Sequence, residues 1–245
     1  MMRVYKADLH NHTFLSPCGD IEMTPRFIIS RAKELGYDII GITDHNTTLQ
    51  GREIKRFAGD SLFILCGAEI TTKEEAHCLA FVDGNDNLDK LQAYLSEHIV
   101  KQPNNVDVFG YQLLINEDEE VIGEEEYLLI SPINKSVDEI ERFVHSLGGI
   151  FIPAHLDKKR DSLISQLGFV PFDLELDAIE LTPKCDAEAF LLQHKYLKKH
   201  NIIRSSDAHY ANDFVTAETH LEMESISFDE IKMALRGENG RGVRS

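Results

Sequence analysis

Cysteine is scarce in this sequence, and long apolar runs are missing from it. The four cysteines form no C-x-x-C pair, which argues against a disulfide framework and against a closed thiolate zinc site. Cys66 and Cys78 lie in apolar segments, where a buried thiol is the expected state. No apolar run approaches the roughly 20 residues of a membrane span. Arg3 leads straight into a predicted strand without a signal peptide, so we expect a cytoplasmic protein.

Basic residues are also few. The sequence has 25 lysines and arginines against 42 aspartates and glutamates, which gives a net charge of −17 with histidine neutral. A surface this acidic repels a phosphate backbone, so a nucleic-acid polymer is not the expected partner. Bound divalent cations would offset part of the excess negative charge. The charge therefore argues against general nucleic-acid binding and is compatible with bound metal.

The order of predicted strands and helices is typical of an α/β fold. A first strand at Val4 and Tyr5 precedes a helix that begins at Thr24-Pro25, and an apolar strand follows at Tyr37–Thr43. Further strands are predicted at residues 62–66, 77–82, 150–153, 178–181 and 202–206. The gap between Glu69 and His77 is too short for a helical crossover, which predicts a hairpin or an irregular barrel there. Without an internal repeat, the 245 residues predict a single domain, 1–245.

Residues from about 104 to 134 interrupt this alternation. Strand-like segments at Val108–Ile115 and Val121–Ile130 flank an acidic stretch, residues 116–120. We interpret this region as an inserted β-hairpin with an acidic tip. The acidic residues lack the spacing of a calcium loop, so a solvated turn is the preferred interpretation.

Two histidines follow the first strand with a spacing that suits a metal site. Residues i and i+2 of an extended chain point to the same side, so His10 and His12 can direct their ring nitrogens to one point. Asp20 lies in the loop that comes next. A single His-x-His pair is weak evidence, because such pairs arise by chance.

The rest of the chain supplies matching residues, nearly all beside a predicted strand. In parallel α/β barrels, functional groups gather where the strands end. Nine nitrogen and oxygen ligands are too many for one ion, but they suit two or three ions that share ligands. The candidate metal ligands are His10, His12, Asp20, His45, Glu69, His77, His155, Asp207 and His209.

In series, these motifs resemble the PHP (polymerase and histidinol phosphatase) superfamily. The resemblance covers essentially the whole chain and is closest to small stand-alone phosphoesterases of that superfamily. It implies a distorted (β/α)7 barrel, here with the inserted hairpin. The matching segments are His10-x-His12, Asp20, Thr43-Asp44-His45, Gly67-x-Glu69, His77, Pro153-Ala154-His155 and Ser206-Asp207-Ala208-His209.

The resemblance also implies three metal ions, with Glu69 bridging two of them. The first ion would be held by His10, His12, Glu69 and Asp207. The second ion would be held by Glu69, His77 and His155. The third ion would be held by Asp20, His45 and His209. Oxygen and imidazole ligands accept zinc, manganese or iron, so the sequence does not fix the metal.

The expected activity is hydrolysis of a phosphoester by attack of a metal-bridging hydroxide, on a small phosphorylated metabolite or nucleotide. Glu69 would act as the bridging ligand, while Asp207 or His209 could serve as the acid for the leaving group, which stays unassigned. Cationic side chains are expected at the substrate phosphate. The candidates are Arg160, Arg204 and Lys158.

Other readings of the same residues remain open. A 3′–5′ exonuclease of the same superfamily would share the metal centre. A metal-dependent amide hydrolase usually carries a bridging lysine or carbamate, and no lysine closes a predicted strand. A metal-loaded regulatory module without turnover is the alternative outside the enzymes. The sequence leaves the substrate and the oligomeric state undetermined.

Overall fold

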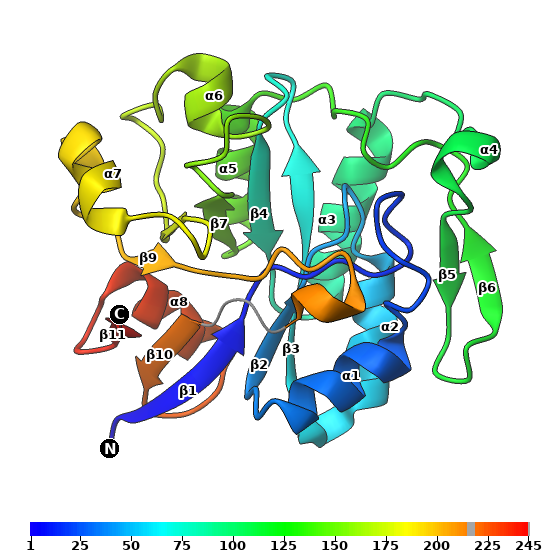
Figure 1. Cartoon of the computed structure of the whole chain (residues 1–245), viewed down its shortest axis with the longest axis horizontal. Coiled ribbons are helices and arrows are strands. Elements are labelled where there is room, and N and C mark those ends of the chain that lie inside the picture. Colours follow the sequence, from blue (N-terminus) through cyan, green and yellow to red (C-terminus); the bar gives the residue numbers. More distant parts are fainter. Residues whose placement is uncertain (215–218, 245) are drawn as a thin grey trace.

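The computed structural model describes residues 1–214 and 219–244 and has an α/β architecture (Figure 1). The strands are β1 (Arg3–Asp8), β2 (Ile39–Ile42), β3 (Phe63–Thr71), β4 (His77–Phe81), β5 (Leu113–Ile115), β6 (Val121–Glu124), β7 (Ile150–Pro153), β8 (Ile179–Glu180), β9 (Ile202–Ile203), β10 (Thr219–Met223) and β11 (Gly242–Arg244). The helices are α1 (Pro25–Glu34), α2 (Leu49–Ala58), α3 (Asn85–His98), α4 (Val106–Phe109), α5 (Val137–Ser146), α6 (Leu163–Leu167), α7 (Ala187–Gln193) and α8 (Phe228–Arg236). Among the described residues, no helix combines the length and the apolarity needed to cross a bilayer.

Seven of the strands form one curled, mixed sheet in the order β11-β10-β1-β2-β3-β4-β7. The β1–β2 and β2–β3 pairs are parallel, whereas the pairs that involve β4, β10 or β11 are antiparallel. The expected hairpin of β3 and β4 is confirmed, with Thr71 opposite His77. The mixed sheet differs from a regular parallel barrel because β4 follows β3 after a turn that is too short to hold a crossover helix.

Hydrogen bonds continue this sheet into a ring. Strands β8 and β9 pair in parallel, and the Leu156 N–H donates to the carbonyl oxygen of Glu180 (2.9 Å), which ties the end of β7 to β8. Past β9, the His12 N–H donates to the carbonyl oxygen of Ala208 (2.9 Å). The chain after β9 therefore lies beside the chain after β1, near the middle of the view in Figure 1.

Alternating side chains divide the core into an inner and an outer layer. In β2, Ile39 belongs to the inner cluster, while Ile40 and Ile42 pack against the helices. Gly41 faces Leu9 so closely that an added Cβ would lie 2.2 Å from the Leu9 carbonyl oxygen, so a larger residue cannot fit there. Helix α8 contributes four buried apolar residues to the inner cluster and covers one end of it.

Side chains cap the beginnings of α1, which was predicted to start at Thr24-Pro25, and of α5. The Thr24 hydroxyl accepts a hydrogen bond from the Phe27 N–H (3.3 Å), with proline at the first helical position of α1. Ser136 and Glu139 form the capping box of α5. These caps satisfy N–H groups that the first helical turn leaves without partners.

The segment around residues 104–134 contains a short antiparallel pair, β5 and β6, beside the main sheet. The prediction of a strand beginning at Val108 is wrong, because residues 106–109 form α4, which Asn105 caps by accepting from the Asp107 N–H (3.2 Å). Gln50 of α2 fixes this segment through two hydrogen bonds to the backbone of Ile115 (2.9 and 3.1 Å). Residues 117–120 form an exposed turn, in agreement with the expected solvated tip.

Candidate metal centre

The rings of His10 and His12 converge just after β1. Their Nε2 atoms lie 3.1 Å apart, and both side chains are fully buried. Asn11 between them forms a parallel bridge with Ala208, which orders the backbone on both sides of the pair. The i, i+2 spacing therefore directs both rings inward, as the sequence predicted.

The carboxylate of Glu69, near the end of β3, lies at the centre of the candidate ligands. Two ligands that are each about 2.1 Å from a tetrahedral ion are about 3.4 Å apart. The two carboxylate oxygens of Glu69 have such spacings to the ring nitrogens of several histidines. Ring nitrogens between 2.9 and 3.4 Å from its two oxygens belong to His10, His12, His45, His77 and His155.

Burial would raise the pKa of Glu69, but the surrounding imidazoles outweigh it. His77, His10 and His45 hold the pKa of this carboxyl well below its usual value, although the side chain is only 1% exposed. Glu69 is therefore a carboxylate across the physiological pH range. An ionised carboxylate can bridge two cations by binding one with each of its two oxygens.

Around His12, His45 and Glu69, ligand atoms that lie close enough to share an ion form three overlapping groups. The first group is the expected set His10, His12, Glu69 and Asp207. The second group is His45, Glu69 and His77, whereas His155 was expected in place of His45. The third group is His12, His45 and His209, whereas Asp20 was expected in place of His12.

His155 and Asp20 lie at the edge of these groups. The Nε2 atom of His155 is 3.0 Å from Glu69 Oε1, so His155 remains beside the second group. The Asp20 N–H donates to the carbonyl oxygen of His209 (2.8 Å), but its Oδ1 accepts from the Glu22 N–H (2.9 Å). Asp20 is thus next to the third group through its backbone, with one carboxylate oxygen engaged in its own turn.

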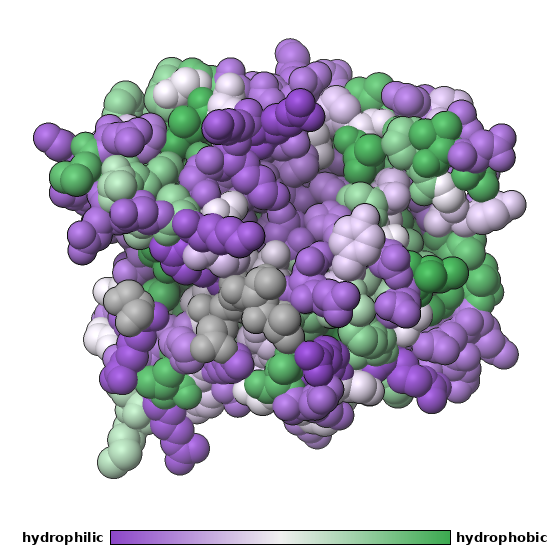
Figure 2. Space-filling model, in the orientation of Figure 1, coloured by the Kyte–Doolittle hydropathy of each residue, from purple (hydrophilic) through white to green (hydrophobic). Residues whose placement is uncertain are grey.

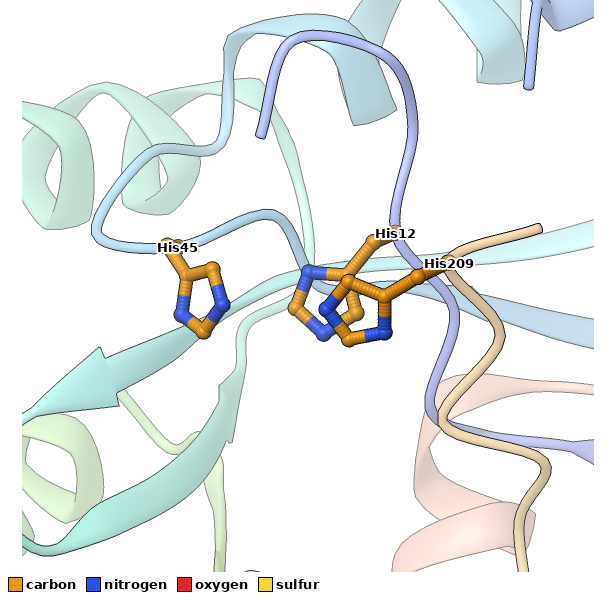
Figure 3. A group of neighbouring side chains, drawn as sticks. All are labelled: His12, His45 and His209. Atoms are coloured by element: carbon orange, nitrogen blue, oxygen red, sulfur yellow. The ribbon is translucent and has the colours of Figure 1, made fainter. Parts of the chain in front are cut away.

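The third group brings together imidazoles from three separate segments (Figure 3). The ring centroids of His12 and His209 are 4.0 Å apart, and those of His12 and His45 are 4.6 Å apart. Burial lowers the pKa of His45 well below its usual value and lowers the pKa of His209 to about 4. Their rings are therefore neutral at physiological pH, which is the form that binds a metal.

Three buried atoms of the cluster have no hydrogen-bond partner among residues 1–214 and 219–244. They are Asp207 Oδ1, His45 Nδ1 and His155 Nδ1. Desolvated polar atoms without partners cost free energy, and metal coordination is one way to satisfy them. Asp207 and His155 also have positive φ angles of 52° and 30°, which are uncommon outside glycine. The donor set and these unpartnered atoms therefore fit divalent metal ions.

Comparison with known proteins identifies the family of this chain. A family model, the PHP domain, matches residues 8–156. The chain belongs to the PHP domain family. The uncharacterized protein YqxK of Bacillus subtilis (strain 168) is 30% identical over an alignment that covers 99% of this PHP chain and 64% of YqxK. The uncharacterized protein MJ1587 of Methanocaldococcus jannaschii is 38% identical over 78 residues, 46% of its own length. The PHP chain thus spans less than two thirds of the length of these relatives.

Solved structures share the fold of this PHP chain at low sequence identity. The lesion-specific endonuclease PfuEndoQ from Pyrococcus furiosus has a TM-score of 0.73 at 19% identity, covering 98% of this chain and 58% of the endonuclease. A two-domain protein from Bacteroides vulgatus that contains a predicted PHP-like metal-dependent phosphoesterase has a TM-score of 0.55 at 14% identity, covering 99% of this chain and 65% of that protein. PHP relatives are metal-dependent hydrolases, and this chain carries the ligand types that such chemistry needs.

Glu180 in β8 contacts two candidate ligands of the PHP centre and was not predicted from the sequence. Its Oε2 lies 3.0 Å from His10 Nδ1 and accepts from the His155 N–H (2.9 Å). Burial lowers the pKa of His10, but Glu180, Asp207 and Glu69 outweigh it and raise that pKa well above its usual value. A carboxylate on Nδ1 fixes the ring so that Nε2 faces the ligands. The only signal was a charged residue in the apolar stretch 178–181.

Asp44 supports the PHP centre from the side of His12. Its Oδ1 accepts from the Thr13 N–H (2.7 Å) and from the Ser16 hydroxyl (2.7 Å). The Ser16 oxygen lies 3.1 Å from His12 Nδ1, so the chain of contacts reaches the ring. Asp44 therefore orders the loop after β1 and fixes the orientation of His12 without being within reach of the ligand groups itself.

The three cations predicted for the phosphate differ in their positions. The Lys158 ammonium pairs with Asp207 Oδ2, which leaves Oδ1 facing His10 and His12. Burial lowers the pKa of Lys158, but Asp207 outweighs this effect and raises the pKa above its usual value. Lys158 is therefore a charged ammonium at the edge of the PHP centre.

The two arginines form no ion pair with the candidate ligands among the described residues. Arg160 is exposed and forms no hydrogen bond with the described residues. Arg204 donates to the backbone carbonyl oxygens of Thr182 (2.5 Å) and Cys185 (2.8 Å), so its guanidinium faces away from the ligands. Of the three predicted cations, Lys158 is the one that pairs with a candidate ligand in the part of the chain that the structure describes.

Proposed function

We propose that this chain is a metal-dependent phosphoesterase that hydrolyses a small phosphorylated metabolite or nucleotide. The observation that carries the proposal is the Glu69 carboxylate among five imidazoles at metal-ligand spacing. Two or three divalent ions, zinc, manganese or iron, would be held there. The hydrogen-bonded ring of β1, β2, β3, β4, β7, β8 and β9 corresponds in this proposal to the distorted seven-stranded barrel of the family.

The protein residues have separate roles in the proposed reaction. When bound, the divalent ions supply Lewis acidity toward the phosphoryl oxygens and lower the pKa of a bound water. Glu69 and Asp207 hold negative charge against these ions, while Glu180 keeps His10 in the ligand orientation. Water adds to phosphorus, the ester P–O bond breaks, and the alcohol leaves with a proton. His209, 21% exposed beside the third ligand group, or Asp207 would take up the proton that the attacking water releases and pass it to the leaving alcohol.

Lys158 is the best-placed residue to contact the substrate phosphate. Its ammonium is charged, 40% exposed and paired with Asp207 at the edge of the cluster. A phosphoryl group that binds beside Asp207 would therefore come within reach of the ammonium, which can turn toward it. Arg160, two residues further along the same loop, would contact a phosphate only after a rearrangement of its exposed side chain.

Hydrolysis of a nucleic-acid phosphodiester is the second candidate. It is favoured by the fold similarity to the lesion-specific endonuclease over 98% of this chain. The net charge of −17 counts against a polymer with a phosphate backbone. A cleavage assay on duplex and single-stranded oligonucleotides, with and without an abasic lesion, separates this candidate from a phosphatase.

A phosphate-release screen tests the proposal directly. The substrates are sugar phosphates, nucleotides and histidinol phosphate, each with added Mn²⁺ or Zn²⁺ and with a chelated control. We expect metal-dependent phosphate release and more than one metal equivalent by elemental analysis, because the ligands form overlapping groups. Protein that stays metal-free after reconstitution and releases no phosphate would contradict the proposal.

A further inference from the structure

A pocket of about 400 Å³ opens beside the rings of His45 and His77. These two imidazoles belong to the candidate metal centre, so the pocket adjoins the place where a phosphoryl group would bind. The rest of its lining consists of Thr71, Glu75, Ile130, Pro132 and Asp161. A substrate bound at the metal centre therefore has one clear space into which its leaving group can extend.

The charges that border this pocket are of one sign. Glu75 lies in the β3–β4 turn and Asp161 in the loop after β7, and both side chains are exposed. Asp161 is fixed next to the centre because its carbonyl oxygen accepts from the His77 N–H (2.7 Å). Among the described residues that line the pocket, none is a lysine or an arginine. Lys158, the cation of the centre, lies instead against Asp207.

The other residues that line this pocket can contact an organic group. Ile130 and Pro132 provide an apolar side. Thr71 is only 5% exposed, and its hydroxyl has no hydrogen-bond partner in the part of the chain that the structure describes. A buried hydroxyl in this state can accept a hydrogen bond from a ligand group at little cost. In Figure 2, hydrophilic side chains occupy the upper middle of the face, in front of β3 and β4.

We propose that this pocket receives the leaving group of the phosphoester and selects one that carries a positive charge, such as a protonated amine. The inference rests on the proposed phosphoesterase function and specifies its substrate class. The phosphoryl group would lie on the side of Lys158, and the cationic part of the substrate would lie between Glu75 and Asp161. The two ends of the site would then recognise the two ends of a zwitterionic substrate.

Matched phenyl phosphates measure this selectivity. The para substituents are aminomethyl, methyl and carboxymethyl, which present a cation, a neutral group and an anion on similar leaving groups. Exposed ion pairs contribute about 0.2–1 kcal/mol each, so two carboxylates predict a kcat/KM ratio of about 2 to 30 for the cationic over the neutral ester. The anionic ester is expected to be slowest, because like charges repel it from the pocket.

Two double variants with equal loss of charge separate the pocket from the net charge. In Glu75→Gln/Asp161→Asn, the ratio of the cationic to the anionic ester should fall to about 1. The control is Asp118→Asn/Glu119→Gln on the exposed β5–β6 turn, where Glu119 has nearly the same backbone φ as Glu75 (63° and 60°). This control should keep the wild-type ratio. The inference is overturned if the wild-type kcat/KM ratio of the cationic to the anionic ester is near 1. It is also overturned if this ratio is the same in both double variants.

A binding measurement distinguishes failure of the inference from failure of the proposed function. Calorimetry on the metal-reconstituted protein compares 3-aminopropylphosphonate with propylphosphonate, neither of which can be hydrolysed. Tighter binding of the aminophosphonate by about 2- to 30-fold, lost in Glu75→Gln/Asp161→Asn, supports the pocket even if no ester is turned over. Ester turnover without charge preference in either measurement refutes the pocket and leaves the phosphoesterase function standing.

Discussion

Replacement of Glu69 by glutamine removes the charge at the centre of the cluster and keeps the size of the side chain. The wild-type carboxylate lies between 2.9 and 3.4 Å from nitrogens of five imidazoles. A glutamine amide has one oxygen and no negative charge, so it cannot bridge two ions. Loss of a hydrogen-bond partner of a metal ligand lowers metal affinity about 10- to 100-fold. Loss of a bridging ligand itself should lower metal affinity by at least about 100-fold.

This loss can be converted into a stability change. At a metal concentration of 100 times the Kd, binding stabilises the folded state by about 2.7 kcal/mol. If Kd rises about 100-fold at the same metal concentration, only about 0.4 kcal/mol remains. The difference of about 2.3 kcal/mol corresponds to about 5–9 °C in Tm for a domain of this size. Metal addition should therefore raise the Tm of the wild type strongly and that of Glu69→Gln slightly.

Differential scanning fluorimetry with and without Mn²⁺ or Zn²⁺ measures both shifts, and a phosphate-release assay measures the rate. The rate of Glu69→Gln should fall on the order of 10²-fold or more. Glu124→Gln is the control, because Glu124 is an exposed carboxylate on β6. If the metal-induced Tm shift of Glu69→Gln equals that of Glu124→Gln, Glu69 is not a bridging ligand and the division into ligand groups is wrong.

Two further predictions concern Lys158 and His145. Lys158→Ala should keep its metals but lose about 10-fold in kcat/KM, which is the lower end for a charge-assisted contact because the ammonium is 40% exposed. Arg160→Ala should leave kcat/KM nearly unchanged. Equal kinetics of the two variants would contradict the assignment of Lys158 to the phosphate. Burial lowers the pKa of His145, but Asp177, which lies 2.9 Å from its Nε2, outweighs burial and raises that pKa. The pair therefore stabilises the fold fully below pH 6.5, and this stabilisation decreases as the pH rises above that value. In urea unfolding, His145→Gln should therefore cost about 1.5–3 kcal/mol at pH 5.5 and less at pH 8, and a pH-independent cost would refute this account.

Much of the centre could be predicted because strand geometry constrains where side chains point. His10 and His12 follow β1 with a spacing of two, which fixes the direction of both rings once β1 is recognised. Glu69 was found just after the predicted strand 62–66 and lies inside the longer β3, which is buried over almost its entire length. Where a ligand follows a strand directly, local sequence is sufficient.

Other features depended on contacts between distant segments. Glu180 acts through His10, 170 positions away, and nothing near it in the sequence indicates that contact. Arg204 follows a strand of only two residues, so alternation could not decide which face it occupies. A strand was predicted to begin at Val108, but the Asn105 cap supports a short helix over residues 106–109. In each case the deciding interaction is one that a window of neighbouring residues does not contain.

The segment around residues 206–209 is joined to the loop after β1. This connection has a consequence for when the proposed metal centre can be loaded. The Ser206 N–H donates to Asp8 Oδ1 across 198 positions of sequence, and His12 binds the backbone of Ala208. Contacts of such long range form late, after the loop-closure entropy has been overcome. During synthesis, Asp207 and His209 emerge long after His10 and His12, so a nascent chain can offer only part of each ligand group. In the proposed metal centre, the full ligand set would therefore become available only after residue 209 has been synthesised, so loading of the whole centre would come at the end of translation or later.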